Sequence, residues 1–514
     1  MRPIPRIPRR GRAKAAFSTS QSIDVPAPIG GLNTRDSLSL MPITDAIKMV
    51  NWVPQPTGLS ARRGYVPITA SYGNPVETAI PYVNGTTKIL ITAAGANIYT
   101  DDVDGTKTSI GSGFTNNKWF SAKIANNMVL VNGQDDPRNF DGASLSTPSI
   151  TGDLATYGEE KMNGIAKHKS RLFMWDSANG DFFYGGVNAV SGAFAKFQLS
   201  RVSNTGGNIL EIKTISRDAG DGGDDYAAFI LDTGEILVYQ GSNPADATAW
   251  ALVGRYVAPP LIAKGCAHEF AGDVLMVTQS DLIKLSDVIK YGSEAGGFNI
   301  TPSKLSGAIA NDFLLYGGNY GWQLTTHPAS GWIIINVPEV AGTTYHQFVV
   351  NTVTGSATRF EGWASYQYAY LDGKLYFGAD DDLMHADVGT SDNGSDIDLL
   401  ALAAYNNLGV PKRKKISNAR LYIFSDGVSS IDLSMGYDYE TPTVQGTQQV
   451  ETSGATWDVA AWDEADWSGL TSKLINFVTS GVGMYVTSQI ALSINGQEIT
   501  WHSTTYNFDI STTY

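Results

Sequence analysis

A short phrase that recurs along the chain constrains the fold more than any other feature of the sequence. The phrase is a turn of Gly, Asn or Asp, then a polar residue, then an apolar run. Its seven copies are NGTTKILIT, ANNMVLVNG, KSRLFMW, DTGEILVYQG, AGDVLMVTQ, SGWIIINV and DGKLYFG, anchored at Lys88, Asn127, Arg171, Glu235, Asp273, Trp332 and Lys374. Successive anchors stand 39, 44, 64, 38, 59 and 42 residues apart. Several steps match the ~40–45 residues of a four-stranded propeller blade, and the two long steps would carry insertions.

A second short apolar segment follows many of these runs after a polar turn. Examples are NIYTD (Asn97 to Asp101), DFFYGG (Asp181 to Gly186), DLIKLSD (Asp281 to Asp287) and DDLMHAD (Asp381 to Asp387). A run, a turn and a second run make a β-hairpin, and repeated hairpins make an antiparallel meander. The sequence therefore predicts an all-β fold, with a β-propeller of about six or seven blades over residues 76–395.

The two ends of the chain lack the phrase and predict a second, antiparallel β-domain. Residues 29–75 form an N-terminal platform segment in this prediction, and residues 396–514 form a C-terminal β platform or nozzle domain. Two stretches favour a helix instead. One is ITDAIKMVNWV, with Thr44 as N-cap. The other is DLLALAAYNNLG (Asp398 to Gly409), in which tertiary context decides between helix and strand.

The first residues of the chain are strongly basic. No acidic residue precedes Asp24, and the basic residues are Arg2, Arg6, Arg9, Arg10, Arg12 and Lys14. The stretch lacks the apolar core of a signal peptide, and its prolines oppose the amphipathic helix of a transit peptide. We interpret residues 1–28 as a flexible basic arm that docks onto an acidic neighbour or nucleic acid. A solvated tail without a task is the alternative.

Composition argues against general nucleic-acid affinity, and the motifs argue against enzymatic chemistry. The 514 residues carry a net charge of −14, whereas nucleic-acid affinity depends on Lys and Arg that neutralise phosphate. Neither G-x-S-x-G nor G-x-x-x-x-G-K-[ST] occurs, and the six histidines never form H-E-x-x-H or a close pair. We therefore predict no enzyme, no catalytic residue, no cofactor and no metal site.

Cysteine and aspartate patterns are consistent with that prediction. Cys266 is the single cysteine, so no internal disulfide forms. We interpret it as buried and inert, because a pair with His268 lacks further ligands nearby. Three Asp-rich stretches, Asp101 to Ser109, Ser216 to Tyr226 and Gly378 to Asp398, resemble calcium loops without completing D-x-[DN]-x-[DN]-G-x5-E. We interpret them as turns, with ion binding as the alternative.

Tryptophan recurs in the segment TWDVAAWDEADWSG. Trp457, Trp462 and Trp467 stand five residues apart, and this spacing aligns on neither one helix face nor one strand face. Each Trp-Asp unit is interpreted as turning a corner under a loop, with a glycan subsite as the alternative.

The segment HQFVVNTVTGSATRFEGW resembles a site presented on a hairpin. Thr354-Gly355 makes the turn, and the period of two in a strand brings Arg359, Glu361 and Trp363 to one face. Val349 and Asn351 stand on the opposing strand. We interpret the segment as a blade hairpin with a packed cross-strand set, not as an active centre.

An ordered series of short segments resembles one protein family. The matching segments are Gly30 to Tyr65 (with Gly30-Gly31-Leu32-Asn33, Asp45-Ala46, Asn51-Trp52 and Arg63-Gly64-Tyr65), Asn127 to Gly142, Ala166 to Trp175, Phe348 to Trp363, Lys374 to Gly394 and the Trp-Asp units near Trp457. In these segments the chain resembles the tail-nozzle proteins of short-tailed bacteriophages, also called tail tubular protein B or tail stabilisation proteins. Ala357 departs from the pattern, because many relatives carry an aromatic residue there.

The resemblance implies a structural virion protein. It implies a homo-hexamer that forms the distal tail tube, or nozzle, for genome retention and ejection, with propellers outside a central β-rich tube. The implied partners are the adaptor (head-to-tail connector), tail fibre or tailspike proteins, transiting dsDNA without sequence specificity, and the host envelope at the tip. The implied location is the virion tail, preceded by the host cytoplasm during assembly.

Two rival functions stay open at this point. One is a glycan-binding or glycan-cleaving β-propeller adhesion protein, and it requires a funnel of Arg, carboxylates and a Tyr at one propeller face. The other is a monomeric extracellular propeller of unknown role.

Overall fold

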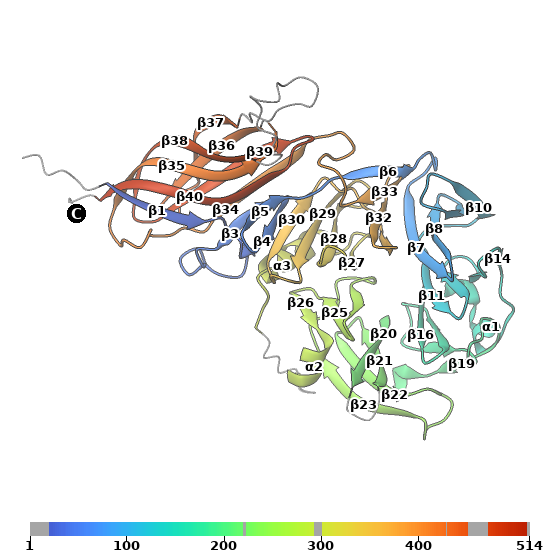
Figure 1. The fold of residues 1–514 in the computed structure, drawn as a ribbon. Coiled ribbons are helices and arrows are strands. Elements are labelled where there is room, and N and C mark those ends of the chain that lie inside the picture. The colour runs from blue at the N-terminus through green and yellow to red at the C-terminus, as the bar shows by residue number, and fades with distance from the viewer. Residues whose placement is uncertain (1–19, 219–222, 292–300, 428, 451–470, 511–514) are drawn as a thin grey trace, which may run out of the picture.

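The computed structural model describes residues 20–218, 223–291, 301–427, 429–450 and 471–510. The six basic residues of the predicted arm, and Trp457, Trp462 and Trp467, lie outside this described part. Strands make up most of the regular structure, so the prediction of an all-β protein is confirmed. Figure 1 shows two bodies, a propeller-like ring of small sheets and an elongated stack of long strands. We call them the propeller ring and the sandwich.

Small sheets follow one another around the propeller ring. The first three are β7 (Val76–Asn84), β8 (Thr87–Ala94), β9 (Asn97–Asp101), β10 (Lys107–Ser112); β11 (Phe120–Ile124), β12 (Asn127–Val131), β13 (Arg138–Phe140), β14 (Leu145–Ser146); and β15 (Ile150–Gly152), β16 (Gly164–His168), β17 (Arg171–Trp175), β18 (Phe182–Tyr184), β19 (Gly192–Phe197). The next two are β20 (Ile209–Asp218), β21 (Gly223–Leu231), β22 (Glu235–Gly241), β23 (Trp250–Val257); and β24 (Ala267–Phe270), β25 (Asp273–Val277), β26 (Leu282–Lys284). The last two are β27 (Gln323–His327), β28 (Trp332–Val340), β29 (Thr344–Asn351), β30 (Ala357–Glu361); and β31 (Tyr368–Leu371), β32 (Lys374–Gly378), β33 (Leu383–Ala386), β6 (Tyr65–Thr69).

Each copy of the repeated phrase forms a strand in a different one of these sheets. The copies are β8, β12, β17, β22, β25, β28 and β32, and most of them pair with the strand at the inner edge of their sheet. The exception is β22, which is one strand further out because the long hairpin of β20 and β21 precedes it. This extra hairpin strand accounts for the 64-residue step to Glu235. The predicted partner strands are confirmed as β9, β18, β26 and β33.

The last sheet of the propeller ring contains a strand from far earlier in the chain. β6 pairs antiparallel with β33, with Tyr65 opposite Ala386 and Val66 opposite His385. Residues 65–69 therefore belong to the propeller ring, although the sequence prediction placed them in the platform segment 29–75. The first strand, β7, in turn lies against β31 and β32, so the ring closes on itself.

The sandwich contains strands from both ends of the chain. Its strands are β1 (Gln21–Pro26), β2 (Gly31–Leu32), β3 (Asp45–Val50), β4 (Trp52–Gln55), β5 (Gly58–Ala61), β34 (Ile397–Ala403), β35 (Lys414–Ser425), β36 (Ser429–Tyr437), β37 (Thr443–Val450), β38 (Thr471–Gly483), β39 (Val486–Ile494) and β40 (Ile499–Ile510). One sheet has the order β38-β35-β40-β5-β4, with β1 beside β40. The other runs β3-β34-β39-β36-β37 and continues through β30 into the propeller ring. The two inner faces pack together through residues such as Leu421, Ile423, Leu433 and Ile490.

Pairing within the sandwich overrides local propensity at two places. Both helix-favouring stretches contain strands, since Asp45–Val50 forms β3 and Ile397–Ala403 forms β34, and the two strands pair with each other. The predicted arm of residues 1–28 is also too long, because Gln21–Pro26 pairs with β40 along its whole length.

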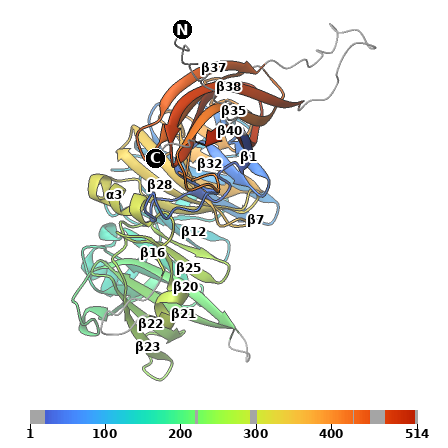
Figure 2. The ribbon, with the colours of Figure 1, turned by 90° about the vertical axis from the view of Figure 1, so that its left-hand side faces the viewer.

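Helices are short and peripheral. They are α1 (Asp153–Tyr157), α2 (Leu285–Tyr291), α3 (Ser306–Tyr316) and the 3-10 turns Glu159–Lys161 and Leu199–Arg201. In the described part of the chain, none of them has the length and hydrophobicity that crossing a bilayer requires. Figure 2 shows the sandwich projecting from one end of the propeller ring, which is seen there close to edge-on.

Candidate functional site: the joint and the central cavity

Arg62 is buried where the sandwich meets the propeller ring. Its Nη1 and Nη2 donate to Asp392 Oδ1 and Oδ2 at 2.8 and 2.6 Å, and its Nε donates to Asn51 Oδ1 at 2.8 Å. The other two N–H groups donate to the backbone carbonyls of Arg63 and Glu361. All five guanidinium donors therefore have acceptors, as a buried arginine requires.

The partners of Arg62 come from distant parts of the chain. Asn51 follows β3 in the sandwich, Glu361 ends β30, and Asp392 lies after the last strand of the propeller ring. The guanidinium also stands over the Trp363 ring, 5.3 Å from its centroid. We call this cluster of Arg62, Asn51, Asp392 and Trp363 the joint, because it ties the sandwich to the propeller ring.

The chain enters and leaves the propeller ring beside the joint. Gly64 N donates to Gly389 O, and Val388 N donates to Gly64 O. A Cβ on Gly64 would stand 1.8 Å from Ser391 O, so only glycine fits between the incoming and outgoing segments. The Arg63-Gly64-Tyr65 match of the family resemblance thus lies at this crossing.

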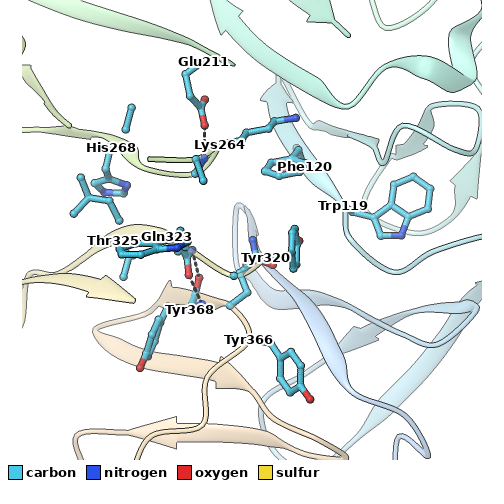
Figure 3. A pocket seen from close by; sticks show the side chains of 18 of the residues that line it. Trp119, Phe120, Glu211, Lys264, His268, Tyr320, Gln323, Thr325, Tyr366 and Tyr368 are labelled. Atoms are coloured by element: carbon cyan, nitrogen blue, oxygen red, sulfur yellow. Dashed lines mark hydrogen bonds between the residues drawn. The ribbon is translucent and has the colours of Figure 1, made fainter. Parts of the chain in front are cut away.

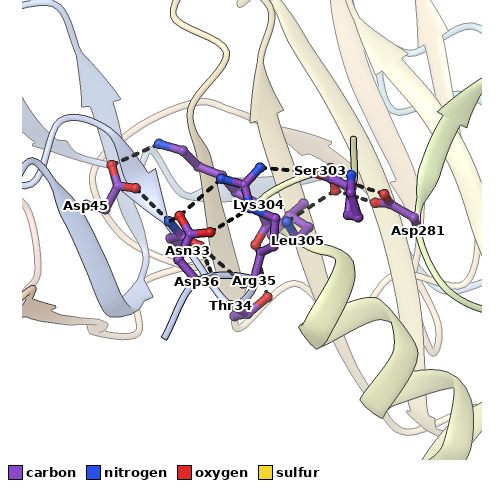
Figure 4. Close-up of polar contacts among 10 residues, drawn as sticks. Asn33, Thr34, Arg35, Asp36, Asp45, Asp281, Ser303, Lys304 and Leu305 are labelled. Carbon is purple, nitrogen blue, oxygen red and sulfur yellow. Dashed lines mark hydrogen bonds and ion pairs between the residues drawn. The ribbon is translucent and has the colours of Figure 1, made fainter. Parts of the chain in front are cut away.

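A second polar cluster fastens the N-terminal segment to the turn before α3 (Figure 4). Lys304 Nζ donates to Asp45 Oδ1 at 2.8 Å and to Gly30 O at 3.0 Å. Asn33 Nδ2 donates to Asp45 Oδ2 at 2.8 Å. Arg35 and Asn33 donate to the Asp36 carboxylate and lower its pKa to about 2. Gly30, Asn33 and Asp45 are further residues of the resemblance, so these matches also lie where distant segments meet.

The predicted hairpin of HQFVVNTVTGSATRFEGW is present as β29 and β30. Val349 pairs with Thr358, and Arg359 Nε lies 2.9 Å from Glu361 Oε1, so the hairpin and its Arg-Glu pair are confirmed. The predicted shared face with Trp363 is wrong. The chain leaves the strand at Gly362, which has a φ of +100°, and this turn puts Trp363 into the core beneath Arg62.

His346 links this hairpin to α3. It is buried, with Nε2 2.8 Å from Asp312 Oδ2 and Nδ1 2.7 Å from Glu339 Oε1. Both ring nitrogens therefore lie within hydrogen-bond distance of a carboxylate oxygen. Arg359 Nη2 donates to the same Glu339 oxygen at 2.7 Å, so this carboxylate joins His346 to Arg359. The arrangement ties α3 to the strands β28, β29 and β30.

The centre of the propeller ring holds a cavity of about 870 Å³. The inner strands β7, β11, β16, β20, β24, β27 and β31 all contribute residues to it, with loop residues such as Lys264 and Tyr320. Figure 3 shows Lys264 and Phe120 on one side of this central cavity, and Tyr320 and Tyr368 on another. Glu211 is the one carboxylate among the described residues that line it, and they include no arginine.

His268 makes stability depend on pH. Its Nε2 lies 3.2 Å from Thr326 Oγ1, and burial, assisted by the nearby Lys213 charge, lowers its pKa from 6.5 to about 4. The unfolded chain binds more protons between these values, so stability is complete above pH 6.5 and falls as the pH drops towards 4. Acidification from pH 7 to pH 5 should cost up to about 2 kcal/mol through this group.

Chemical denaturation at several pH values checks this prediction. In His268→Gln, which is neutral throughout and retains a donor towards Thr326, the loss between pH 7 and pH 5 should shrink by most of that amount. A loss of the same size in both proteins would contradict it.

Other residues singled out in the sequence are structural. Cys266 is fully buried, and burial raises its pKa to about 12. Asp101 Oδ1 accepts from Val103 N at 2.8 Å and Asp104 Oδ1 from Thr106 N at 2.9 Å, so these aspartates cap their turn. Within the described residues, no group of three or more His, Cys, Asp or Glu is placed to hold a metal ion.

Arg62, Asp312 and Glu339 carried no signal in the sequence as functional residues. Arg62 pairs with Asp392, 330 residues later, and Asp312 on α3 contacts His346, 34 residues later. Glu339 contacts His346 across β28 and β29, and no local spacing marks any of these pairs.

Comparisons with known proteins give no family. No family model matches the chain, and no curated protein matches it. Among solved structures, it is similar to the computationally designed Ika8 protein, with a TM-score of 0.36 and 10% identity over 63% of this chain and 100% of that one. It is also similar to BBS1N in complex with ARL6DN (TM-score 0.38, 8% identity, 63% and 98% covered) and to a chain of the Mitotic Checkpoint Complex (TM-score 0.34, 9% identity, 74% and 98% covered).

Proposed function

We propose that this chain is the tail-nozzle subunit of a short-tailed bacteriophage. In this proposal it is a structural virion protein whose homo-hexamer forms the distal tail tube for genome retention and ejection. The propeller ring is a seven-bladed β-propeller, one blade for each copy of the repeated phrase. The sandwich of N- and C-terminal strands is the platform and tube domain. The ordered sequence resemblance motivates the proposal, and the placement of its residues at the joint supports it.

One surface carries the assembly part of the proposal. The outward face of the sheet β38-β35-β40 displays Leu474 and Val478, which are 58% and 82% exposed. Tyr422 and Phe424 lie half-buried beside them on β35. The exposed positions along β38 are uncharged, namely Ser472, Leu474, Asn476, Val478, Ser480 and Val482.

A row of six exposed positions without a charge is unusual in a chain with a net charge of −14, although Arg420 of the neighbouring β35 donates to Asn476 within this row. Copies of a chain with this net charge repel one another least where two such uncharged rows meet. Exposed apolar patches bordered by polar residues mark protein interfaces. We therefore assign this face to the contact between neighbouring copies in the hexamer.

The acidic balance also suits a DNA conduit. A wall that carries negative charge does not bind phosphate, so dsDNA passes without sequence specificity. The proposed partners are the adaptor, tail fibre or tailspike proteins and the host envelope, and the proposed location is the virion tail after assembly in the host cytoplasm. The residues Arg2 to Lys14 remain a proposed contact with a neighbour or DNA.

An image of the purified particle that contains this chain tests the function. A six-fold, tapered tube that carries the chain is the expected result. A particle in which the chain occupies a fibre, a capsid shell or no fixed place would contradict the proposal.

Substitution of the apolar face tests the interface. Val478→Asp places a charge where a neighbouring copy packs, and burying an unpaired carboxylate costs several kcal/mol. Incorporation of the chain into purified particles, measured by quantitative immunoblot, should fall by at least about tenfold. The matched control is Val353→Asp, on a hairpin turn of the propeller ring where the side chain is 80% exposed. Equal incorporation of both variants would contradict the assigned interface.

The glycan-cleaving alternative lacks support in the central cavity. Its funnel needs Arg and several carboxylates, whereas the described lining residues offer Glu211 and two lysines.

A further inference from the structure

Lys264 is unusual among the lysines of the propeller ring. It lies between β23 and β24, and its side chain extends towards Phe120 on the same side of the central cavity (Figure 3). Its Nζ stands 3.8 Å from the centroid of the Phe120 ring and 5.7 Å from that of Trp175. Its hydrogen bond to Asn163 Oδ1 is long, at 3.4 Å.

The carboxylate of the cavity does not neutralise this amine. Glu211 Oε1 accepts from Gly265 N at 2.6 Å, and its Oε2 pairs with Lys213 Nζ at 3.4 Å. Lys264 therefore projects into a ligand-sized space with aromatic rings beside it and no ion pair within 4 Å in the described residues.

Burial beside aromatic rings disfavours the protonated form of this amine. Burial, together with the nearby positive charge of Lys213, lowers the pKa of Lys264 to about 7. The negative charges of Glu211 and Asp176 act in the opposite direction. About half of the amine is unprotonated at pH 7 and so carries a free lone pair. A desolvated lysine of this kind is a nucleophile towards carbonyl compounds.

Lys414 shows what a structural buried lysine looks like in the same chain. Burial lowers its pKa too. Its Nζ, however, donates to the carbonyls of Val410, Lys412 and Met484 at 2.6–2.8 Å. Those three acceptors occupy all three ammonium hydrogens. Among the described residues, Lys264 Nζ has the distant Asn163 Oδ1 as its single acceptor.

We propose that the central cavity is a carbonyl-capture site, in which Lys264 forms a reversible imine with a small aromatic aldehyde. The amine lone pair attacks the carbonyl carbon and the N–C bond forms. The carbonyl oxygen then leaves as water with the two amine hydrogens, and no oxidant or reductant takes part. Phe120 and Trp175 stack against the aldehyde ring. This site is independent of the proposed tail function.

Labelling with pyridoxal tests the proposal. The full-length chain is incubated with pyridoxal at pH 6–10, imines are trapped with borohydride, and modified peptides are quantified by mass spectrometry. At pH 7 Lys264 should be labelled at least about tenfold faster than the exposed Lys290, whose pKa is raised by Tyr291. The rate at Lys264 should level off above about pH 8, while that at Lys290 keeps rising.

Two variants locate the reaction. Lys264→Arg keeps the positive charge without the nucleophile, so the fast-reacting fraction should disappear. Lys213→Arg, in the same cavity but paired with Glu211, should leave it intact. Equal labelling of Lys264 and Lys290 at pH 7, or a Lys264 rate that rises through pH 10, would overturn the proposal even if neither variant folds.

Discussion

Replacing Arg62 with Met is expected to lower the free energy of unfolding by about 3–5 kcal/mol. The change removes five hydrogen bonds and leaves the buried Asp392 carboxylate without its cation. An unpaired buried charge costs more than the ion pair itself contributes, and this is why removing one partner is so damaging. Urea denaturation followed by circular dichroism measures this loss.

Neighbouring variants separate charge from packing at the joint. Arg63→Ala removes an exposed side chain one residue away and should change stability by less than about 0.5 kcal/mol. Adding Asp392→Asn to Arg62→Met should recover part of the loss, because the amide needs no counter-charge. A loss below about 1 kcal/mol for Arg62→Met would show that the joint does not depend on this ion pair.

A disulfide between residues 66 and 385 is expected to raise stability by about 4 kcal/mol. Val66 pairs with His385 across β6 and β33, so Cys side chains there would share one face of the sheet at bonding distance. The bond would close a loop of about 320 residues, and long loops gain most from cross-linking in the chain-entropy description. The native Cys266 is buried and does not compete.

Thermal unfolding of Val66→Cys with His385→Cys, oxidised and reduced, measures the gain. The single variant Val66→Cys controls for the substitution itself. If oxidation produced no cross-link, or a cross-linked protein that melts no higher, the closure of the propeller ring by β6 would be wrong.

Sequence patterns were sufficient for the strands of the propeller ring. The turn-plus-apolar-run phrase depends on local chemistry, because turn residues and short hydrophobic runs act within a hairpin. That is why all its copies are strands, and why the Arg359–Glu361 pair is found as predicted.

Long-range pairing was beyond the same reasoning. Asp45–Val50 has helical periodicity, yet it lies between β30 and β34, and that position dictates a strand. The sequence prediction assigned β6 to the platform segment and not to the propeller, because its partner β33 stands more than 300 residues later in the chain. Arg62 stood next to a recognisable motif, but its acceptors come from three separate segments.

The make-up of the sandwich from both ends of the chain also fixes an order of events during protein synthesis. The strands β1, β3 and β5 leave the ribosome early, but their partners β40 and β34 are made only after the whole propeller ring. At roughly 5–20 residues per second, the intervening ~335 residues take on the order of 15–70 s. During that interval the first strands are exposed edges, which attract other nascent chains. The sandwich can therefore fold only in chains whose synthesis has passed β40.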